Sequence, residues 1–437
     1  MAKDTFTITR KIQLVPVGDK TEVNRVYNYI REGMKAQNLA MNQYISALYL
    51  GMQNDVSKDD RKELNNLFSR ISTSKKGSAY DESIQFAKGL PIGSMTRKVK
   101  SDFDTAMKKG LKYGKLSLPT YKDSNPLLVH VDYVRLRSTN PHQDSGLYHN
   151  YTNHTEFLEH LYKSDFELFI KFANYITFKI ILGNPHKSAE IRDVFKNIFE
   201  ECYAIQGSSI GIYNNKIICN LSISIPKKQL CLDENIVVGV DLGLAVPAVC
   251  ALNTVPYIHK SLGNYDDFVR ERTKMQSQRK RLQKSLNYAN GGHGRKKKLQ
   301  SLERLKKRER NWVQTYNHKI SKQIVDFAIK NKAQYINIED LSGFDSSQFV
   351  LRNWSYFELQ QFIEYKANKY GIIVRKINPY HTSQTCSFCG HWEEGQRISQ
   401  SEFICKNPEC VNHNKSINAD YNAARNIAMS TDFVKNN

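Results

Sequence analysis

The sequence predicts an α+β multidomain protein in which a β-rich region with a helical insert precedes an α/β region. Three observations support this fold class. The chain has 437 residues, more than one compact core holds, and a hydrophobic content of 40% that suffices for several cores. In the first half, segments with strand-like alternation precede and follow a long helical stretch. In the second half strands alternate with helices, which is typical of a largely parallel sheet.

The first half begins with an extended segment and continues as helix. Residues 5–17 alternate as a strand does, and apolar residues then recur at helical spacing from Val23 to Leu50, after Thr21 as a possible cap. Further helical segments, the first led by Ser57, continue to residue 111. We therefore expect a helical block of about three helices.

Strand character returns after the helical block. One helix, at about residues 189–203, interrupts the strands. The predicted strands are residues 116–118, 127–131, 166–182 and 216–225. The simplest arrangement is a β-barrel or sandwich that the first strand enters, with the helical block inserted before the remaining strands return.

The second half opens on Ile236–Asp241, which is apolar on both faces and so predicts a buried central strand. Residues 245–252 are its expected hairpin partner. The elements that follow are helices at 312–328 and 354–369, strands at 334–338 and 372–377, and a closing helix at 419–429. A cysteine-rich segment precedes that last helix.

The charge of the chain is strongly basic and unevenly spread. Lys and Arg number 64 against 43 acidic residues, a net charge of +21, which indicates a polyanionic partner such as nucleic acid or an anionic membrane surface. Residues 270–310 hold 16 basic and 3 acidic residues and predict a helical hairpin broken at Asn290–Gly294. Its candidate nucleic-acid contacts are Arg270, Arg272, Arg279, Lys280, Arg281, Arg295, Lys296 and Lys297.

Two features bear on location. No apolar run reaches the roughly 20 residues that span a bilayer, and the first residues alternate like a strand and do not form a signal-peptide core. The chain has eight cysteines, none before Cys202, and half of them are spaced as metal ligands, which favours a reducing compartment. We expect a cytoplasmic protein.

Four cysteines near the end of the chain form a candidate zinc site. They are Cys386, Cys389, Cys405 and Cys410, in the pattern C-x2-C-x15-C-x4-C. Four thiolates fill the tetrahedral shell of Zn²⁺ and leave no position for water, so this metal would fold a ribbon and not catalyse. His391 and His413 lie near enough in the sequence to be substitute ligands.

The remaining candidates have ordinary explanations. We expect the other four cysteines to be small buried apolar side chains, since free cysteine is usually buried; they are Cys202, Cys219, Cys231 and Cys250. Four aromatic residues, Tyr121, Tyr133, Phe169 and Tyr175, could stack on bases, but packing in a core is favoured. The helix at 23–50 could likewise offer a dimer face, with core packing again favoured.

Three acidic residues at the ends of predicted elements are candidate catalytic groups. Asp241 ends one buried strand, Glu339 ends another, and Asp420 opens the last helix. A buried acid must be protonated, paired with a base or bound to a cation, and these motifs hold no fixed base. Oxygen-only ligands select Mg²⁺ or Mn²⁺, and two such ions about 4 Å apart promote phosphodiester cleavage. The predicted chemistry is therefore nucleic-acid hydrolysis.

Each acidic motif is weak by itself. Asp241 could be a plain turn residue, and Asp420 a helix cap. Asp340 follows Glu339 directly, but strand alternation would direct it to the opposite face of the sheet, so Glu339 is favoured. The combination and order of the motifs carry the prediction.

With Gly-Val-Asp241-Leu-Gly, Ile-Glu339-Asp-Leu, Thr-Cys386-Ser-Phe-Cys389-Gly and Asp420-Tyr-Asn-Ala-Ala-Arg-Asn-Ile in this order, the chain resembles the TnpB and miniature type V-F CRISPR effector nucleases. The resemblance is specific from about residue 236 to 429. It implies an RNase H-like RuvC domain with a zinc ribbon inserted before its last helix, in which Asp241, Glu339 and Asp420 are the catalytic acids. For the first half it implies an oligonucleotide-binding wedge β-barrel with a helical recognition insert.

The resemblance also implies a division of the chain. The wedge barrel would take residues 1–20 and 113–232, the recognition domain 21–112, the RuvC domain 233–380 and 416–437, and the zinc ribbon, which would bind target nucleic acid, 381–415. Two features depart from relatives. No cysteine precedes Cys202, so an N-terminal zinc finger is absent, and Asn418 stands where many members carry a second acid.

In this family a guide RNA pairs with one DNA strand after the protein reads a short flanking motif, so pairing supplies most of the sequence choice. The CRISPR members resembled, which serve antiviral defence, act as two copies on one guide RNA, whereas the transposon relatives act singly. The resemblance thus implies guide RNA, double-stranded target DNA, a homodimer, Mg²⁺ and Zn²⁺. A transposon-encoded TnpB-type nuclease, a guide-free structure-specific nuclease and a nuclease-dead RNA-guided repressor are the alternatives.

Overall fold

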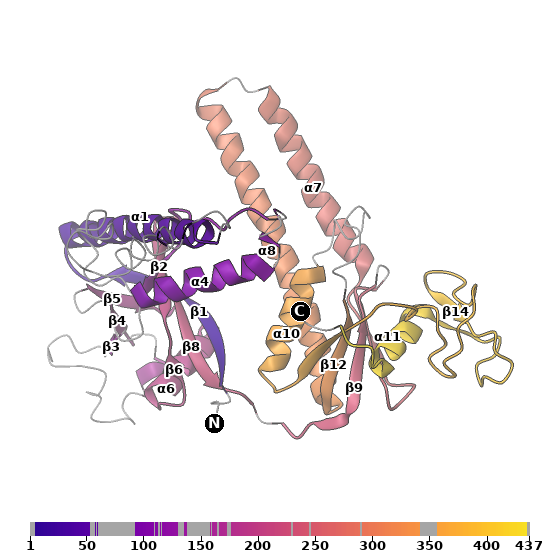
Figure 1. The fold of residues 1–437 in the computed structure, drawn as a ribbon. Coiled ribbons are helices and arrows are strands. Elements are labelled where there is room, and N and C mark those ends of the chain that lie inside the picture. The colour runs from indigo at the N-terminus through magenta and orange to yellow at the C-terminus, as the bar shows by residue number, and fades with distance from the viewer. Residues whose placement is uncertain are drawn as a thin grey trace. The chain divides into compact units, whose positions relative to one another are not determined.

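The computed structural model describes residues 5–52, 57, 59, 92–108, 110–111, 114, 116–129, 135–137, 158, 160–163, 166–172, 176–228, 230–243, 246–288, 291–340 and 356–434. The chain forms two compact units, residues 1–226 and 227–437 (Figure 1). Both combine helices with sheet, so the protein is a mixed α and β multidomain structure. In the part of the chain that is described, no helix is long and apolar enough to cross a membrane.

The first unit is built on an antiparallel sheet. The strands are β1 (Thr5–Pro16), β2 (Leu127–Val129), β3 (Arg135–Arg137), β4 (Leu168–Phe172), β5 (Ile176–Ile181), β6 (Ala204–Ile205), β7 (Ser208–Tyr213) and β8 (Lys216–Pro226). Their order is β2-β7-β8-β1-β5-β4-β3, with β6 also paired to β8. The first strand lies in the middle because β8 pairs with it from Thr5 to Leu14 and β5 pairs with its last four residues.

The first unit also contains helices α1 (Lys20–Leu50), α4 (Ile92–Lys108) and α6 (Ala189–Phe199), and a short 3₁₀ helix at Pro185–Lys187. The side-chain amide of Gln37 in α1 forms two hydrogen bonds with the backbone at the start of β2. Its Nε2 donates to Pro126 O at 3.0 Å, and its Oε1 accepts from Leu128 N at 2.7 Å. Apolar residues of α1, such as Ile30 and Met41, are buried in the common core. The apolar stripe of this helix therefore serves mainly core packing.

Several details of the first unit differ from expectation. The cap of α1 is Asp19, not Thr21, because Asp19 and Glu22 form a reciprocal capping box. Residues 116–118 do not form a strand. The helix expected to reach residue 203 ends at Phe199, and β6 begins soon after it. The helical segments expected over residues 60–91 lie outside the described residues.

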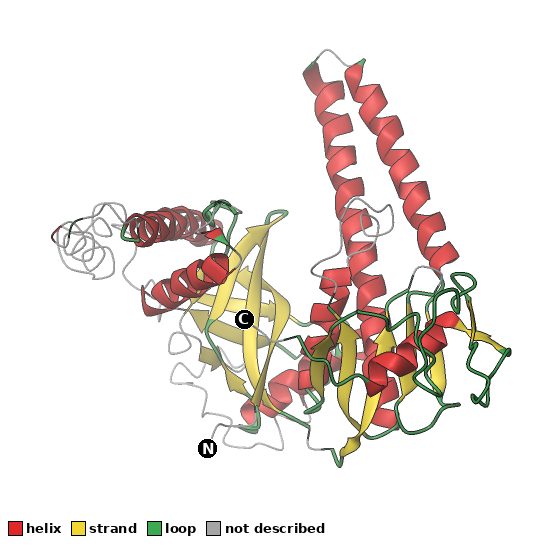
Figure 2. Cartoon of the chain, turned by 45° about the vertical axis from the view of Figure 1, so that its right-hand side comes forward, coloured by secondary structure: helices red, strands yellow, loops and turns green. Residues whose placement is uncertain are grey.

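The second unit is built on a five-stranded sheet. Helices lie on both faces of this sheet and give three layers (Figure 2). Its strands are β9 (Asp233–Asp241), β10 (Ala248–Leu252), β11 (His259–Leu262), β12 (Ala333–Glu339) and β13 (Ile373–Ile377), in the order β11-β10-β9-β12-β13. The pairs from β9 to β13 are parallel and those from β9 to β11 antiparallel, so the sheet is mixed and not largely parallel. The central position of β9 is as predicted.

Helices cover both faces of this sheet. α8 (Gly292–Lys330) and α10 (Tyr356–Asn368) pack on the face that carries Val240 and Ile338. α11 (Ala419–Met429) packs on the other face. α7 (Tyr265–Asn287) and the first part of α8 form a helical hairpin. The two helices expected along 295–328 are one, because no glycine or proline interrupts residues 295–330.

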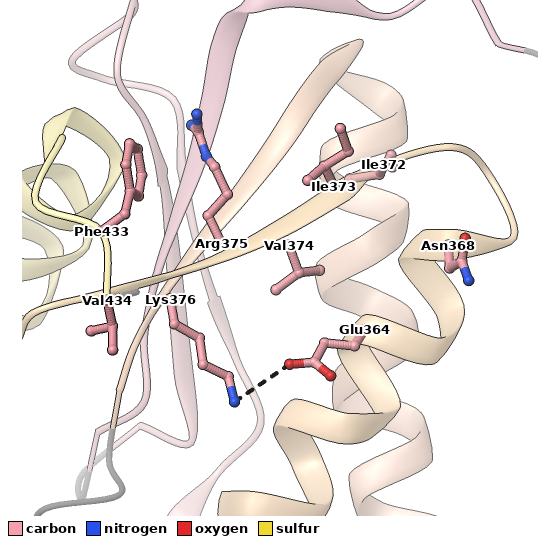
Figure 3. A pocket seen from close by; sticks show the side chains of 9 residues that line it. All are labelled: Glu364, Asn368, Ile372, Ile373, Val374, Arg375, Lys376, Phe433 and Val434. Carbon is pink, nitrogen blue, oxygen red and sulfur yellow. Dashed lines mark ion pairs between the residues drawn. The ribbon is translucent and has the colours of Figure 1, made fainter. Parts of the chain in front are cut away.

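A pocket lies along the edge strand β13, beside the C-terminal segment (Figure 3). Glu364 of α10 pairs with Lys376 across it at 3.7 Å. Arg375 lies between two rings, 3.8 Å from the centroid of Tyr335 and 4.7 Å from that of Phe433. Val434 N donates to Lys376 O at 3.0 Å, so this seam joins the C-terminal segment to the sheet. It contains none of the three predicted acids.

Candidate active site

Asp241 and Glu339 end neighbouring parallel strands. β9 and β12 pair in register, Ile338 opposite Val240, so each acid is the next residue along its own strand. The carboxyl ends of parallel strands lie at the same edge of a sheet, and both acids therefore emerge there, partly exposed. Residues alternate between faces, so Asp241 and Glu339 lie on the same side as Gly239 and Asn337.

α11 brings the third acid to this edge. Asp420 is the second residue of the helix and is only 4% exposed. A Cβ placed on Gly243, just beyond β9, would lie 3.8 Å from the Asp420 carboxyl group. Asn418 caps α11 by accepting a hydrogen bond from Tyr421 N at 2.8 Å. The structure thus gathers all three predicted acids at one edge.

Close packing fixes α11 against the sheet. A Cβ on Gly239 would lie 2.0 Å from Ala424 O and 2.3 Å from Ala428 N, so only glycine allows this approach. The wholly buried Asn337 donates to Ile427 O at 2.9 Å and accepts from Arg375 Nε at 3.0 Å. These two residues of neighbouring strands set the distance and the register of the helix that carries Asp420.

The charges of Glu339 and Asp420 disfavour the ionised form of Asp241. The pKa of Asp241 is raised well above its ordinary value, first by burial and then by the charges of Glu339 and Asp420. Burial also raises the pKa of Glu339 and of Asp420. Such a cluster takes up protons or a cation. Asp340, by contrast, lies just beyond β12 and donates its backbone N–H to Ile377 O at 2.9 Å.

Two neighbours moderate this repulsion, and neither follows from a sequence pattern. Arg397 Nη2 lies 3.8 Å from Asp420 Oδ1, and its charge lowers the pKa of all three acids. The Thr382 hydroxyl donates to the Glu339 carboxylate. Arg397 comes from the cysteine-rich segment, distant in sequence from every acidic motif, so no local spacing could have indicated it.

The four cysteines are arranged as a zinc site. Their sulfur atoms all lie within 4.8 Å of one another, with 3.9 Å between Cys386 and Cys410 and 3.7 Å between Cys389 and Cys405. Tetrahedral Zn²⁺ with Zn–S bonds of about 2.3 Å requires sulfur atoms about 3.8 Å apart, so the residues fit the ion. Among the described residues this is the one cluster of three or more potential ligands so closely gathered.

The two histidines considered as substitute zinc ligands make other contacts, and the remaining four cysteines lie outside the cluster. His391 Nε2 lies 3.3 Å from Glu393, and Asn414 Nδ2 lies 3.0 Å from His413 Nε2. Cys219 and Cys250 are buried as expected. Cys202 and Cys231 are exposed, so the expectation of burial was wrong for them. Cys202 lies in the connection between α6 and β6, and Cys231 in the connection between β8 and β9.

Some basic residues of the α7–α8 hairpin bond within it, and the others are exposed to solvent. Glu309 is 8% exposed, with Arg279 at 3.0 Å and Arg272 at 3.7 Å. Arg295 Nη1 donates to Leu286 O near the end of α7 at 3.2 Å. The exposed members of the predicted set are Arg270, Lys280, Arg281, Arg295, Lys296 and Lys297. Arg272, Arg279 and Arg295 thus join α7 to α8, and the other members of the set face solvent.

Two of the four aromatic residues considered for base stacking, Tyr121 and Phe169, are described, and both lie in the first unit. Tyr121 is buried, donates its hydroxyl to Asp102 at 2.8 Å and belongs to the core of the first unit. Phe169 of β4 is half-buried. Tyr133 and Tyr175 lie outside the described residues.

Comparison with known proteins identifies the family. The chain is 34% identical over 363 residues to the CRISPR-associated endodeoxyribonuclease Cas12f1 of Sulfoacidibacillus thermotolerans, covering 82% of this chain and 81% of that protein. The chain belongs to the Cas12f1 family. A family model for the Cas12f1-like TNB domain matches residues 356–427, which include Asp420 and all four zinc-site cysteines.

Structural and more distant similarities agree with Cas12f1 membership. A solved structure of a Cas12f1–sgRNA–target DNA complex has a similar fold, with a TM-score of 0.66, 20% identity, and coverage of 98% of this chain and 99% of that one. A TnpB-like protein of Methanocaldococcus jannaschii is 35% identical over 120 residues, 26% of this chain and 41% of that protein. The resemblance to both groups is therefore confirmed, and it extends over most of the chain for Cas12f1.

Proposed function

We propose that this Cas12f1-family chain is an RNA-guided DNA endonuclease that hydrolyses phosphodiester bonds at Asp241, Glu339 and Asp420. The observation that carries the proposal is the meeting of these three acids at one edge of the second sheet. The names of its relatives support DNA as the substrate and an RNA as the guide. In this assignment the second unit is a RuvC domain of RNase H type, and the first holds the wedge barrel and recognition insert.

Asp241, Glu339 and Asp420 would hold Mg²⁺ or Mn²⁺. The donor set consists of carboxylate oxygens, which these ions prefer, and the raised pKa of Asp241 marks a cluster that lacks enough positive charge. When bound, the ions supply Lewis-acid stabilisation of the attacking and leaving oxygens of the phosphodiester. The zinc ribbon would hold its own ion through the four cysteines, with a structural role.

The remaining steps belong to the protein's own side chains. The Thr382 hydroxyl orients the Glu339 carboxylate by its hydrogen bond. Arg397 donates from Nε to Ser399 O at 3.4 Å and from Nη2 to Gln400 O at 3.0 Å, which holds its guanidinium beside Asp420. Its positive charge would draw the scissile phosphate toward the acids. The exposed basic residues of the α7–α8 hairpin would attract the nucleic-acid backbone.

We further propose the domain boundaries and assembly that the family resemblance implies. The protein would read a short DNA motif beside the target, and pairing of the guide RNA with one DNA strand would then open the duplex. Two copies of the chain would share one guide RNA. Size-exclusion chromatography with light scattering on the RNA-loaded protein tests the homodimer: a mass corresponding to one chain per guide would contradict it.

A cleavage assay tests the function. Guide-loaded wild-type protein should cut matched DNA in Mg²⁺, and Asp241→Asn, Glu339→Gln and Asp420→Asn should each lose at least about a hundredfold in rate, since each removes a ligand charge. Treatment with RNase should abolish wild-type activity, which separates a guided from a guide-free nuclease. Wild-type rates in Asp241→Asn would refute the assignment, and an inactive wild-type protein would favour the nuclease-dead repressor.

RNA that copurifies with the protein decides its origin. A guide transcribed from a CRISPR repeat array is expected for a Cas12f1-family chain. Sequencing that instead returns a transposon-end transcript would place the chain with its TnpB-like relatives.

A further inference from the structure

Three rings gather on the surface at the entry to the zinc ribbon. Tyr380 is 75% exposed and Trp392 is 50% exposed. His381 lies between them, with its ring centroid 3.8 Å from that of Tyr380 and 4.7 Å from that of Trp392. The Tyr380–His381 pair meets edge to face, and the His381–Trp392 pair is tilted by 56°. We call Tyr380, His381 and Trp392 the ring cluster.

The backbone that carries the ring cluster is held in a defined conformation. His381 has φ of +57°, and its carbonyl accepts hydrogen bonds from Gln384 N and Thr385 N, both at 3.1 Å. Gln384 Oε1 lies 3.1 Å from His381 Nδ1 and accepts from Trp392 Nε1 at 3.2 Å. One side chain therefore fixes two of the three rings.

The same turn is attached to the candidate active site. Thr382, the residue after His381, donates to the Glu339 carboxylate. Asn426 of α11 donates to Thr382 O at 2.8 Å and to Thr385 O at 2.6 Å. α11 also carries Asp420. The ring cluster is thus joined to two of the three acids through Thr382 and Asn426, and is positioned together with them.

Such a surface suits a particular ligand. Large rings exposed to water forgo the free energy of burial, yet the hydrogen bonds of Gln384 hold His381 and Trp392 in place at the surface. Any unpaired base can stack its face on an aromatic ring, so this kind of binding does not depend on the DNA sequence. Bases in a duplex already stack on one another, so only a single strand offers free faces.

We propose that the ring cluster stacks unpaired bases of the DNA strand next to the phosphate to be cut. The inference rests on the proposed function, because it assigns the strand that leads into the Asp241–Glu339–Asp420 site. Arg397, which lies beside Asp420, would hold the backbone while the ring cluster holds the bases. Tyr380, His381 and Trp392 are thus binding residues that set where the strand enters.

Binding to abasic DNA distinguishes stacking from charge. The dissociation constant of a single-stranded 12-mer is measured by fluorescence anisotropy on guide-loaded protein, in an Asp241→Asn background that prevents cleavage. Trp392→Ala and Tyr380→Ala should each weaken binding about 5- to 30-fold, the lower part of the range for loss of one base-stacking side chain. With a 12-mer whose central bases are replaced by abasic sites, the same variants should bind as the parent does.

Two control variants are matched to this test. Trp392→Phe keeps a ring and should recover most of the affinity, whereas Ile398→Ala removes an exposed apolar side chain of the same ribbon, 56% exposed, and should change nothing. Each variant must retain one zinc ion per chain by mass spectrometry, which excludes ribbon unfolding. The salt dependence of binding should keep its slope, because no phosphate contact is lost.

The outcomes separate the inference from the proposed function. Equal losses with normal and abasic DNA, no loss at all, or a larger loss for an RNA 12-mer than for DNA would overturn the ring cluster as a DNA-stacking site. If the wild-type protein does not cleave but the abasic comparison holds, the proposed function fails alone. If the protein cleaves and Trp392→Ala matches the parent, the inference fails alone.

Discussion

Gly239→Ala is the substitution whose effect on catalysis follows most directly from the packing. Gly239 faces α11, and an added Cβ would lie 2.0 Å from Ala424 O, where ordinary contacts begin at 3.4 Å. The obstacle is backbone, so no side chain can rotate away. Relief requires α11 to move from β9 by about 1.4 Å, and Asp420 must move with it. A misplacement of about 1 Å at reacting groups can cost about a hundredfold in rate.

We therefore expect Gly239→Ala to cut matched DNA about a hundredfold more slowly in single-turnover assays with guide and Mg²⁺. Overpacking costs about 1–3 kcal/mol, so the melting temperature should fall by about 2 to 10 °C while the protein stays folded at 25 °C. Gly294→Ala is the matched control: a Cβ there meets nothing within 4 Å and the residue lies in α8, so cleavage should be unchanged and the melting temperature should not fall. Wild-type cleavage and melting by Gly239→Ala would show that α11 does not set the position of Asp420.

Three further predictions concern charge and metal. In Mg²⁺-free buffer the melting temperature, measured by calorimetry, should fall as pH rises from about 4 through the raised pKa of Asp241, because Asp241 ionises less readily in the folded state than in the unfolded state. Added Mg²⁺ should reverse this fall in the wild-type protein but not in Asp241→Asn. Arg397→Gln should slow single-turnover cleavage at least tenfold and move its acid limb to higher pH, since the acids lose a charge that lowers their pKa; an unchanged profile would contradict that role. Cys405→Ser should lower both the zinc content and the cleavage rate, because the ribbon carries Arg397 and Thr382, which contact the acids. Full cleavage activity in a zinc-free variant would show that the active site does not depend on the folded ribbon.

The sequence predicted the parts of the second unit whose signals are local. Residues 419–429 form the closing helix as expected, and the apolar run before Asp241 is the central strand. The four cysteines lie together, as their metal-ligand spacing in the sequence predicted. Glu339 and not Asp340 faces Asp241, as strand alternation required. These features follow from periodicity and ligand spacing along the chain, which is why the sequence predicts them.

What the sequence missed depends on contacts between distant residues. Arg397 reaches Asp420 only through the fold of the ribbon, and Gln384 joins His381 to Trp392 by hydrogen bonds that no periodicity indicates. Arg272 and Arg279 belong to a basic run, and only the packing of α7 on α8 shows that both contact Glu309. Tyr380 and Trp392 could not be distinguished from core aromatics because exposure is a property of the fold.

The most direct measurement of the central claim is anomalous diffraction at the manganese edge from crystals of the guide-loaded protein in Mn²⁺. Two peaks about 4 Å apart, with carboxylate oxygens of Asp241, Glu339 and Asp420 as ligands, are the expected result. Peaks that involve none of these residues, or carboxyl groups that remain more than about 10 Å from any common ion, would contradict a two-metal hydrolytic site.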